Sequence, residues 1–359
     1  MRKKIRKIAI FQNLPPGGGK RALQELLFLL KKKYTVKEFT YNLRKPKNLF
    51  EFLKLIYFTL PKVNYKIANK INNNFDLAFI NHDFYTKSPY LLRYLKIPSI
   101  YLCHESLREF YEDSKLFINS WKYKFINLLR LPLKYIDKQN ICYADLILTN
   151  SSFSKKNLCK IYKKKEIEKI QLGVNTKKFF WKKKKRRRFF LGIGALAKFK
   201  GHDFIIETLS LLPREKRFPY CVVASGGRDE EYIRGLAKRK KVDLIVKKRV
   251  SDKELINLYN KAKFLLIGAY NEPFGLVALE AMACGLPVIS VAEGGLKEII
   301  INDFCGFTIG RRKEKFAKVI NEALTRQFNE KKIKDYVIKK WQWKVSVKQL
   351  EEYFRRVCQ

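Results

Sequence analysis

The segment from Phe264 to Val291 constrains the fold most, because strand, turn and helix patterns follow one another at short intervals. The apolar run from Phe264 to Ala269 predicts a buried strand. After Gly275, apolar residues repeat at helical spacing, and Gly285-Leu286-Pro287 is expected to end this helix. The run from Pro287 to Val291 then predicts the next strand. Similar alternation extends over the whole chain and predicts an α/β fold with parallel sheets.

Two carboxylates stand in this segment at positions suited to binding. Glu272 is expected on a loop at the carboxyl end of the first strand, and Glu280 about one turn into the helix. The amides of Gly275, Leu276 and Val277 lie between them at a helix N-terminus, which favours anions. Glu272 can accept hydrogen bonds from sugar hydroxyls, and Glu280 can accept them from a ribose diol. The amides can bind a diphosphate. The pattern predicts a sugar-nucleotide pocket, and an ordinary buried βαβ unit with two chance glutamates is the alternative.

The block from Glu272 to Ile289 resembles the E-x7-E signature of retaining GT-B glycosyltransferases of the family 4 type, and the match continues through Glu293 to Ile299. The resemblance implies an α/β GT-B fold with two doubly wound Rossmann-like domains facing a cleft. Residues 1–175 would form the acceptor-binding domain, and residues 176–340 the nucleotide-sugar-binding domain. Residues 341–359 would form a helix that crosses back to the N-terminal domain.

The block from Gly194 to Gly201 resembles the family's G-R-L-x3-K-G motif, in which the arginine and the lysine hold the donor diphosphate. Lys200 coincides with the family lysine, whereas Ala195 stands where the arginine is expected. A missing guanidinium removes a bidentate phosphate ligand. Either Lys198 compensates, or the chain is a catalytically weakened glycosyltransferase-like subunit. For Lys200 itself, the alternative is one solvated lysine among many.

The N-terminal half contains two further candidate groups. Gly17-Gly18-Gly19 stands between a predicted strand and a helix expected from about Arg21 to Lys32, and glycines there let a ligand approach backbone amides. It resembles the family's glycine-rich first loop, and a flexible turn is the alternative. His104 ends the predicted strand from Ser99, and the block Glu105 to Tyr111 resembles mannosyltransferase-like members. In them this histidine lies beside the transferred sugar, and a core histidine is the alternative.

The resemblance, applied residue by residue, implies a complete site. Catalytic roles fall to His104, Lys200 and Glu272. Donor contacts are implied for Gly18, Gly19, Lys200, Glu272, Phe274, Gly275, Leu276, Val277 and Glu280. The sequence has no D-x-D at a suitable strand end and no histidine–carboxylate motif with metal spacing. We therefore expect retaining, metal-independent transfer of a hexose from a nucleotide-diphosphate sugar, with no cofactor. The expected acceptor is a glycan or a lipid-linked molecule in cell-surface polysaccharide or glycolipid synthesis.

The charge of the chain keeps a second class of function open. Lys and Arg total 77 against 33 Asp and Glu, a formal net charge of +44. Such a field attracts nucleic acid, acidic lipid headgroups or phosphorylated substrates. A nucleic-acid-binding protein on a Rossmann-like scaffold is therefore the alternative function. The absence of a zinc-finger, RRM-type or clear helix-turn-helix pattern disfavours nucleic acid as a partner.

Two segments mix aromatic, apolar and basic residues, namely Phe50 to Phe58 and Phe117 to Ile126. Each suits an anionic membrane surface, with lysines on lipid phosphates, and a helix buried against the sheet is the alternative. No apolar run is long enough for a transmembrane helix, and seven scattered cysteines form no C-x-x-C pair. We expect a cytoplasmic protein, peripheral on the cytoplasmic membrane face. The basic stretch from Lys177 to Arg188 is expected to be an exposed connector between the halves.

Overall fold

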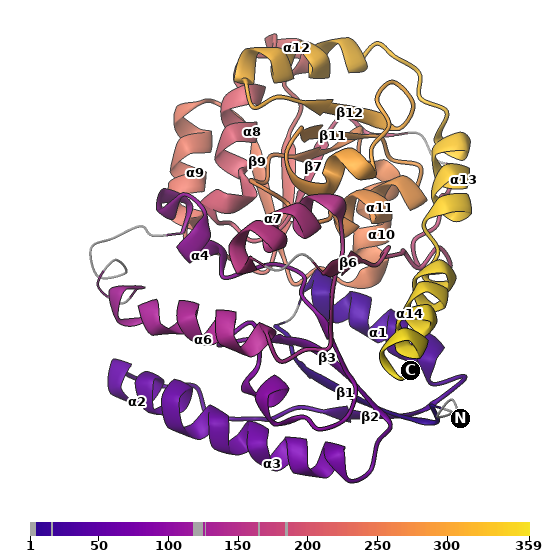
Figure 1. Cartoon of the computed structure of the whole chain (residues 1–359). Coiled ribbons are helices and arrows are strands. Elements are labelled where there is room, and N and C mark those ends of the chain that lie inside the picture. Colours follow the sequence, from indigo (N-terminus) through magenta and orange to yellow (C-terminus); the bar gives the residue numbers. More distant parts are fainter. Residues whose placement is uncertain (1–4, 16, 118–124, 126, 164–165, 184–185) are drawn as a thin grey trace. The chain divides into compact units, whose positions relative to one another are not determined.

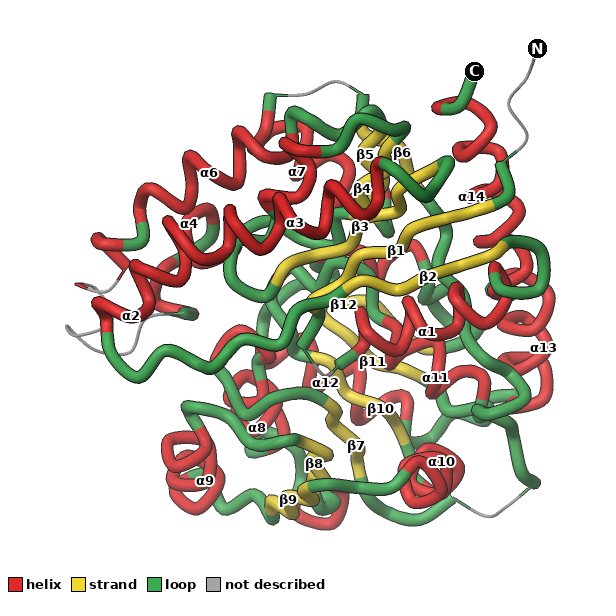
Figure 2. Tube along the Cα trace, turned by 90° about the horizontal axis from the view of Figure 1, so that it is seen from below, coloured by secondary structure: helices red, strands yellow, loops and turns green. Residues whose placement is uncertain are grey.

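The computed structural model describes residues 5–15, 17–117, 125, 127–163, 166–183 and 186–359. The chain forms two compact units. Unit 1 comprises Met1–Leu172 and Trp343–Gln359, and unit 2 comprises Gly173–Gln342. Each unit is built on a six-stranded parallel sheet, and Figures 1 and 2 show the strands among the helices. The predicted α/β fold with two doubly wound sheets is confirmed.

The sheet of unit 1 has the strand order β2-β1-β3-β4-β5-β6. Its central strands are buried on both faces, as parallel strands covered by helices require, and β3 is buried over its whole length. The strands are β1 (Lys7–Asn13), β2 (Thr35–Phe39), β3 (Leu77–Asp83), β4 (Ser99–Leu102), β5 (Leu146–Thr149) and β6 (Ile167–Lys169).

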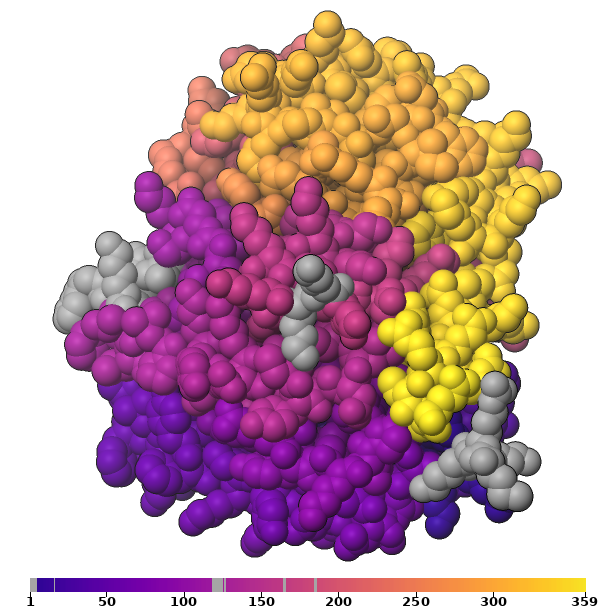
Figure 3. Space-filling model, viewed as in Figure 1, coloured from indigo at the N-terminus to yellow at the C-terminus, as the bar shows by residue number. Residues whose placement is uncertain are grey.

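The helices of unit 1 cover both faces of this sheet. They are α1 (Gly18–Leu30), α2 (Leu49–Lys54), the π-helix η1 (Leu55–Thr59), α3 (Leu60–Asn72), α4 (Arg108–Tyr111), α6 (Leu131–Ile141), α7 (Ser152–Tyr162) and α14 (Trp343–Val357), with 3-10 turns η2 (Tyr90–Tyr94) and η3 (Ser114–Leu116). Helices α3, α6 and α7 pack on one face. Helix α14 packs against α1 and brings Phe354 to Phe79 of β3 on the other, with ring centroids 6.0 Å apart. Figure 3 shows the outer side of α14 in yellow.

The start of α1 corrects one prediction. The helix begins at Gly18 and not near Arg21, so Gly18 and Gly19 form its first turn and only Gly17 precedes it. Gly17 has a φ of +156°, which lets the chain turn from β1 into the helix. The prediction was wrong because glycines disfavour helix interiors, whereas the first turn tolerates them.

The sheet of unit 2 has the order β12-β11-β10-β7-β8-β9. Its strands are β7 (Phe190–Ile193), β8 (Tyr220–Ala224), β9 (Leu244–Lys248), β10 (Phe264–Ile267), β11 (Val288–Val291) and β12 (Gly306–Ile309). Its helices are α8 (His202–Leu209), α9 (Glu230–Arg239), α10 (Asp252–Lys261), α11 (Leu276–Ala283), α12 (Lys313–Ala323) and α13 (Glu330–Lys340), with 3-10 turns η4 (Lys198–Lys200), η5 (Arg214–Lys216) and η6 (Gly294–Glu298). Helix α10 begins at a serine cap, since Ser251 Oγ accepts a hydrogen bond from the Glu254 amide at 3.2 Å.

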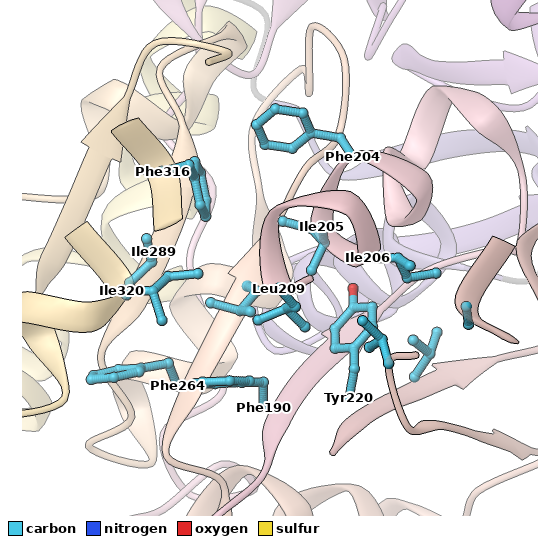
Figure 4. Close-up of a cluster of buried hydrophobic side chains, with 14 of the residues drawn as sticks. Phe190, Phe204, Ile205, Ile206, Leu209, Tyr220, Phe264, Ile289, Phe316 and Ile320 are labelled. Carbon is cyan, nitrogen blue, oxygen red and sulfur yellow. The ribbon is translucent and has the colours of Figure 1, made fainter. Parts of the chain in front are cut away.

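The core of unit 2 lies between the sheet and helices α8, α9 and α12. Figure 4 shows Phe190, Tyr220 and Phe264 of the strands directed toward side chains of α8 and α12. Each such side chain contributes about 1.5–3 kcal/mol when fully buried. Because strand residues alternate, Leu191 and Leu265 point to the opposite face. This packing fixes the strand ends from which the candidate site is built.

The basic stretch from Lys177 to Arg188 corrects part of a second prediction: most of its described residues are exposed as expected, but it lies within unit 2 and does not connect the halves. Phe179 is buried against Tyr259, with ring centroids 6.0 Å apart. The Arg186 guanidinium donates to the Glu330 carboxylate at 2.6 Å and to the Tyr259 carbonyl at 2.9 Å. The high charge of the stretch obscured its buried ring and its anchored guanidinium, which attach it to unit 2. These residues belong to unit 2.

Candidate functional site

The strand order of unit 2 creates a switch point between β7 and β10. The chain runs outward from β7 through β8 to β9, then returns to β10 and runs outward on the other side. In open parallel sheets, ligands bind outside the carboxyl ends of the strands at this point. The loops that follow β7 and β10 carry Lys200 and Glu272. They touch each other, because Tyr270 donates its amide proton to the Phe199 carbonyl at 2.9 Å.

Lys200 and Glu272 form an ion pair across this point. The Lys200 ammonium lies 2.8 Å from Glu272 Oε2, and both side chains are partly buried, with 26% and 18% exposure. The sequence assigned these groups to different parts of a ligand, and the structure joins them to each other. A partly buried pair is screened less by salt than an exposed one. Each side chain therefore holds the other at the carboxyl edge of the sheet, and an anionic ligand group can replace Glu272 as the partner of Lys200.

The N-terminus of α11 lies directly beyond Glu272. Gly275 caps the helix with a φ of +105°, and the first amide bonded within the turn is that of Ala278, which donates to the Gly275 carbonyl at 2.9 Å. Within the described part of the chain, the amides of Gly275, Leu276 and Val277 contact no acceptor. These three amides are the donors that the sequence predicted. They leave the end of the helix suited to an anion.

Two predicted donor residues are more buried than the sequence suggested. Glu280 is 5% exposed, and its Oε2 accepts a hydrogen bond from the Tyr259 hydroxyl at 2.8 Å. Phe274 is buried, and its ring packs against Trp341 with centroids 5.8 Å apart. The side chain of Phe274 therefore serves the core, and its backbone is the part next to α11. Tyr259 was not predicted, because it lies on α10 and no sequence spacing links it to Glu280.

The position of the absent arginine is occupied by the methyl group of Ala195 in the loop after β7. Lys198, the suggested replacement, is directed elsewhere. Its Nζ lies 5.2 Å from the centroid of the Tyr232 ring, and its amide donates to the Asp229 carboxylate at 2.8 Å. Lys198 is therefore engaged with α9 and its preceding loop, while Lys200 pairs with Glu272.

The remaining predicted residues come together at the carboxyl edge of unit 1. Gly19 lies beside His104, since a Cβ placed on Gly19 would be 3.9 Å from His104 Cδ2. The His104 amide donates to Nε2 of His82 at 3.1 Å, which requires that this nitrogen of His82 carries no proton. Burial lowers the pKa of His104 to about 4, with Glu105 opposing and Lys87 assisting this shift. The His104 ring is therefore neutral at pH 7.

Several buried polar atoms at this edge have no partner among the described residues. They are Nε2 of His104, both amide atoms of Asn81 and Oδ1 of Asn150. These residues lie at or just beyond the ends of β4, β3 and β5. A buried polar group without a hydrogen bond costs about 1–3 kcal/mol, and such groups in native proteins usually meet water or a ligand. The sequence assigned no role to Asn81 or Asn150, because tertiary packing decides whether a buried amide finds a partner.

The described residues contain neither a candidate metal site nor a candidate membrane span. No group of three or more His, Cys, Asp or Glu side chains there is arranged to hold a metal ion. Within those same ranges, no helix combines the length and the apolar composition needed to cross a membrane.

The sequence of unit 2 matches a known family. Residues 174–340 fit the model of the glycosyl transferases group 1. An uncharacterized glycosyltransferase from Methanocaldococcus jannaschii is 27% identical over 219 residues, which cover 60% of this chain and 60% of that protein. A D-inositol 3-phosphate glycosyltransferase from Xylanimonas cellulosilytica is 34% identical over 123 residues, covering 32% of this chain and 28% of that protein. The matched segments thus span less than two thirds of these relatives.

Solved structures resemble the chain over nearly its full length. A sucrose-phosphate synthase from Thermosynechococcus elongatus has a TM-score of 0.78 at 18% identity, covering 98% of this chain and 99% of that one. The Anabaena protein HepE in complex with UDP-glucose has a TM-score of 0.73 at 16% identity, covering 97% and 99%. At these identities the likeness establishes the fold, and the predicted GT-B fold is confirmed.

Proposed function

We propose that this chain, whose residues 174–340 belong to the glycosyl transferases group 1, transfers a hexose from a nucleotide-diphosphate sugar to a glycan or lipid-linked acceptor. The observation that carries the proposal is the Lys200–Glu272 pair, 2.8 Å apart, beside the unbonded amides of α11. Cationic and anionic groups next to a helix N-terminus suit a ligand that combines hydroxyls with a diphosphate. The structure of HepE with UDP-glucose supports a sugar nucleotide as donor.

Donor binding would exchange partners at the ion pair. The Lys200 ammonium and the amides of Gly275 to Val277 would bind the diphosphate and stabilise its charge as the sugar leaves, without a metal ion. When Lys200 turns to phosphate, the Glu272 carboxylate is released to accept hydrogen bonds from sugar hydroxyls. Glu280 would accept hydrogen bonds from the ribose diol. Because Tyr259 already donates to Glu280 at 2.8 Å, that carboxylate is held in one orientation.

Unit 1 would contribute neutral groups. A His104 ring that is uncharged at pH 7 can hydrogen-bond a sugar hydroxyl without adding a cation, and Gly18 and Gly19 leave the backbone of α1 open to a ligand. Retention of configuration, the family 4 type and a mannosyltransferase-like specificity are parts of this proposal. Their support is the E-x7-E block and the block that follows His104. We assign the acceptor to unit 1 and a role in cell-surface polysaccharide or glycolipid synthesis on the same ground.

We also propose that the protein is cytoplasmic and docks on an anionic membrane. Phe50 and Phe58 of the α2–η1 segment are 76% and 65% exposed, and Lys54 lies between them in the sequence. The π-helix η1 ends at Thr59, two residues before Pro61, whose ring needs extra room in a continuous helix. The second predicted segment, Phe117 to Ile126, lies mostly outside the described residues. Phe50→Ser with Phe58→Ser should reduce sedimentation with phosphatidylglycerol vesicles, and unchanged sedimentation would contradict this docking.

The proposed activity is tested first by donor binding. The protein is screened by thermal shift against UDP-, GDP- and ADP-sugars. At least one of them should raise its melting temperature, because a ligand that binds only the folded state stabilises that state. The donor found there is then tested for hydrolysis or transfer by the purified chain. Binding without turnover would favour the weakened subunit, and Ala195→Arg should then restore activity. No binding, together with retention of DNA or RNA on filters and a steep salt dependence, would favour the nucleic-acid alternative.

A further inference from the structure

Arg311 follows β12 at the carboxyl edge of the unit 2 sheet, and no motif assigns it a role. Its guanidinium donates to both carboxylate oxygens of Glu293, each at 2.7 Å. It also donates to the carbonyl oxygens of Gly268 at 2.9 Å and Ala269 at 3.1 Å. Gly268 and Ala269 follow β10, and Glu293 follows β11. One side chain thus ties together the ends of three neighbouring strands.

The same guanidinium covers the residues that lead to Glu272. Its Cζ lies 3.5 Å from the centroid of the Tyr270 ring, a close cation–π contact. Asn271 has a φ of +44°, a left-handed conformation that asparagine adopts more readily than other residues with a Cβ, and it turns the chain between Tyr270 and Glu272. The Glu272 carbonyl then accepts a hydrogen bond from the Gly295 amide at 2.8 Å. The backbone is therefore fixed on both sides of Asn271, and before it Arg311 acts together with the hydrogen bond from the Tyr270 amide to the Phe199 carbonyl.

We propose that Arg311 is a positioning residue, which fixes the loop after β10 so that the Glu272 carboxylate stays at Lys200. The planar guanidinium of an arginine can donate to one carboxylate and two carbonyls at the same time while its face packs on an aromatic ring. The compact ammonium of lysine cannot reproduce that geometry. The catalytic consequence of this inference rests on the proposed function, whereas the effect on the loop does not.

Hydrogen exchange tests the effect on the loop, with Arg311→Lys as the variant and Arg217→Lys as the matched control. The Arg217 guanidinium also donates to two backbone carbonyls, of Ser210 at 2.7 Å and Leu212 at 2.9 Å, but it precedes β8 at the amino edge. In Arg311→Lys, amides from residue 268 to 275 should exchange about tenfold faster than in the wild type. In Arg217→Lys they should exchange at the wild-type rate. Unchanged exchange in Arg311→Lys, or an equal increase in both variants, would overturn the proposal.

Steady-state kinetics tests the catalytic consequence with the donor identified by thermal shift. Arg311→Lys should lower kcat by about 10–100-fold while the donor KM changes by less than about threefold, because a misplaced carboxylate affects the reacting geometry more than donor binding. Arg217→Lys should keep the wild-type kcat. A wild-type kcat in Arg311→Lys would overturn the inference. If the wild-type chain turns over no sugar nucleotide, the proposed function fails, and the exchange measurement still decides the role of Arg311 in the loop.

A second variant, Tyr270→Leu, tests the proposal if Arg311→Lys does not fold. Tyr270→Leu removes the ring beneath the guanidinium and leaves the four hydrogen bonds of Arg311 available. A smaller increase in exchange over residues 268 to 275 is expected. Wild-type exchange in Tyr270→Leu would count against the proposal.

Discussion

The carboxyl edges of the two sheets differ in the chemistry that they present. The edge of unit 2 is charged and largely paired within itself, by Lys200 with Glu272 at 2.8 Å and by Arg311 with Glu293 at 2.7 Å. The edge of unit 1 also has an ion pair, Lys87 with Glu105 at 2.6 Å, and in addition it contains buried neutral groups without partners among the described residues, including His104 Nε2 and the Asn81 amide. A charged, internally paired edge is ready to exchange one anion for another. Neutral groups with unmet hydrogen bonds suit a ligand rich in hydroxyls.

This difference explains which residues the sequence could reveal. Lys200, Glu272 and Glu280 lie in motifs whose spacing reflects one strand, one turn and one helix, and the structure places them as local geometry requires. Tyr259 and Arg311 contact the site from other elements of unit 2, so only tertiary packing brings them there. The unpartnered amide of Asn81 is a property of its surroundings, which no local pattern records.

The fold shows a similar division. Buried strands such as β10 and β11 were predicted from their apolar runs, because a strand covered on both faces needs apolar residues throughout. Three of the four edge strands, β2, β6 and β12, were missed, whereas the fourth, β9, was expected from its run Leu244 to Lys247. Strand β2, with the sequence Thr-Val-Lys-Glu-Phe, has no buried residue, and it pairs with β1 alone. An edge strand needs less apolar character, so its sequence resembles that of a loop.

The largest effect is expected from removing the cation of unit 2. Lys200→Ala should lower kcat by about 10²–10³-fold, or about 3–4 kcal/mol, because the leaving diphosphate loses its ammonium partner. Lys198→Ala is the control, since Lys198 lies over Tyr232, and its activity should change far less. Steady-state kinetics with the identified donor measures both. Equal decreases of kcat in the two variants would contradict a specific role of Lys200 at the diphosphate.

The next effect concerns the buried neutral histidine of unit 2. Burial lowers the pKa of His202 from 6.5 to about 4, and its Nδ1 lies 2.9 Å from the Tyr220 hydroxyl. Below pH 6.5 the His202 ring takes up a proton in the unfolded chain but not in the folded chain. The free energy of unfolding therefore has its full value above pH 6.5 and falls as the pH is lowered toward 4. At pH 4 the free energy of unfolding should be lower by about 3 kcal/mol. Urea unfolding of His202→Asn should show a weaker pH dependence than the wild type, and identical profiles would refute this assignment.

A smaller effect is expected at the ribose-binding carboxylate. Glu280→Ala should weaken donor binding by about 1–3 kcal/mol, because the ribose hydroxyls lose their acceptor. The variant also removes the acceptor of the Tyr259 hydroxyl, so Tyr259→Phe is the matched comparison: it keeps the Glu280 carboxylate but loses the bond that orients it, and it should weaken donor binding less than Glu280→Ala does. Calorimetric titration compares the three proteins. Donor affinity unchanged in Glu280→Ala would remove Glu280 from the site.

The smallest change in stability is expected for a variant of Asn81 in unit 1, in contrast to the variants of unit 2. Asn81→Leu replaces an amide with no partner among the described residues by an apolar group of similar size. The free energy of unfolding should stay within about 1 kcal/mol of the wild type or rise, while transfer to the acceptor declines. Urea unfolding and kinetics on one preparation give both values. A large loss of stability would show that Asn81 serves the fold of unit 1.

The central claim is that the carboxyl edge of unit 2 holds the diphosphate of a sugar nucleotide. Hydrogen exchange with and without saturating donor tests it directly. The account predicts slower exchange in residues 194–201 and 269–277, which contain the two loops and the N-terminus of α11. Protection confined to other segments, or no protection at a donor concentration that raises the melting temperature, would contradict it.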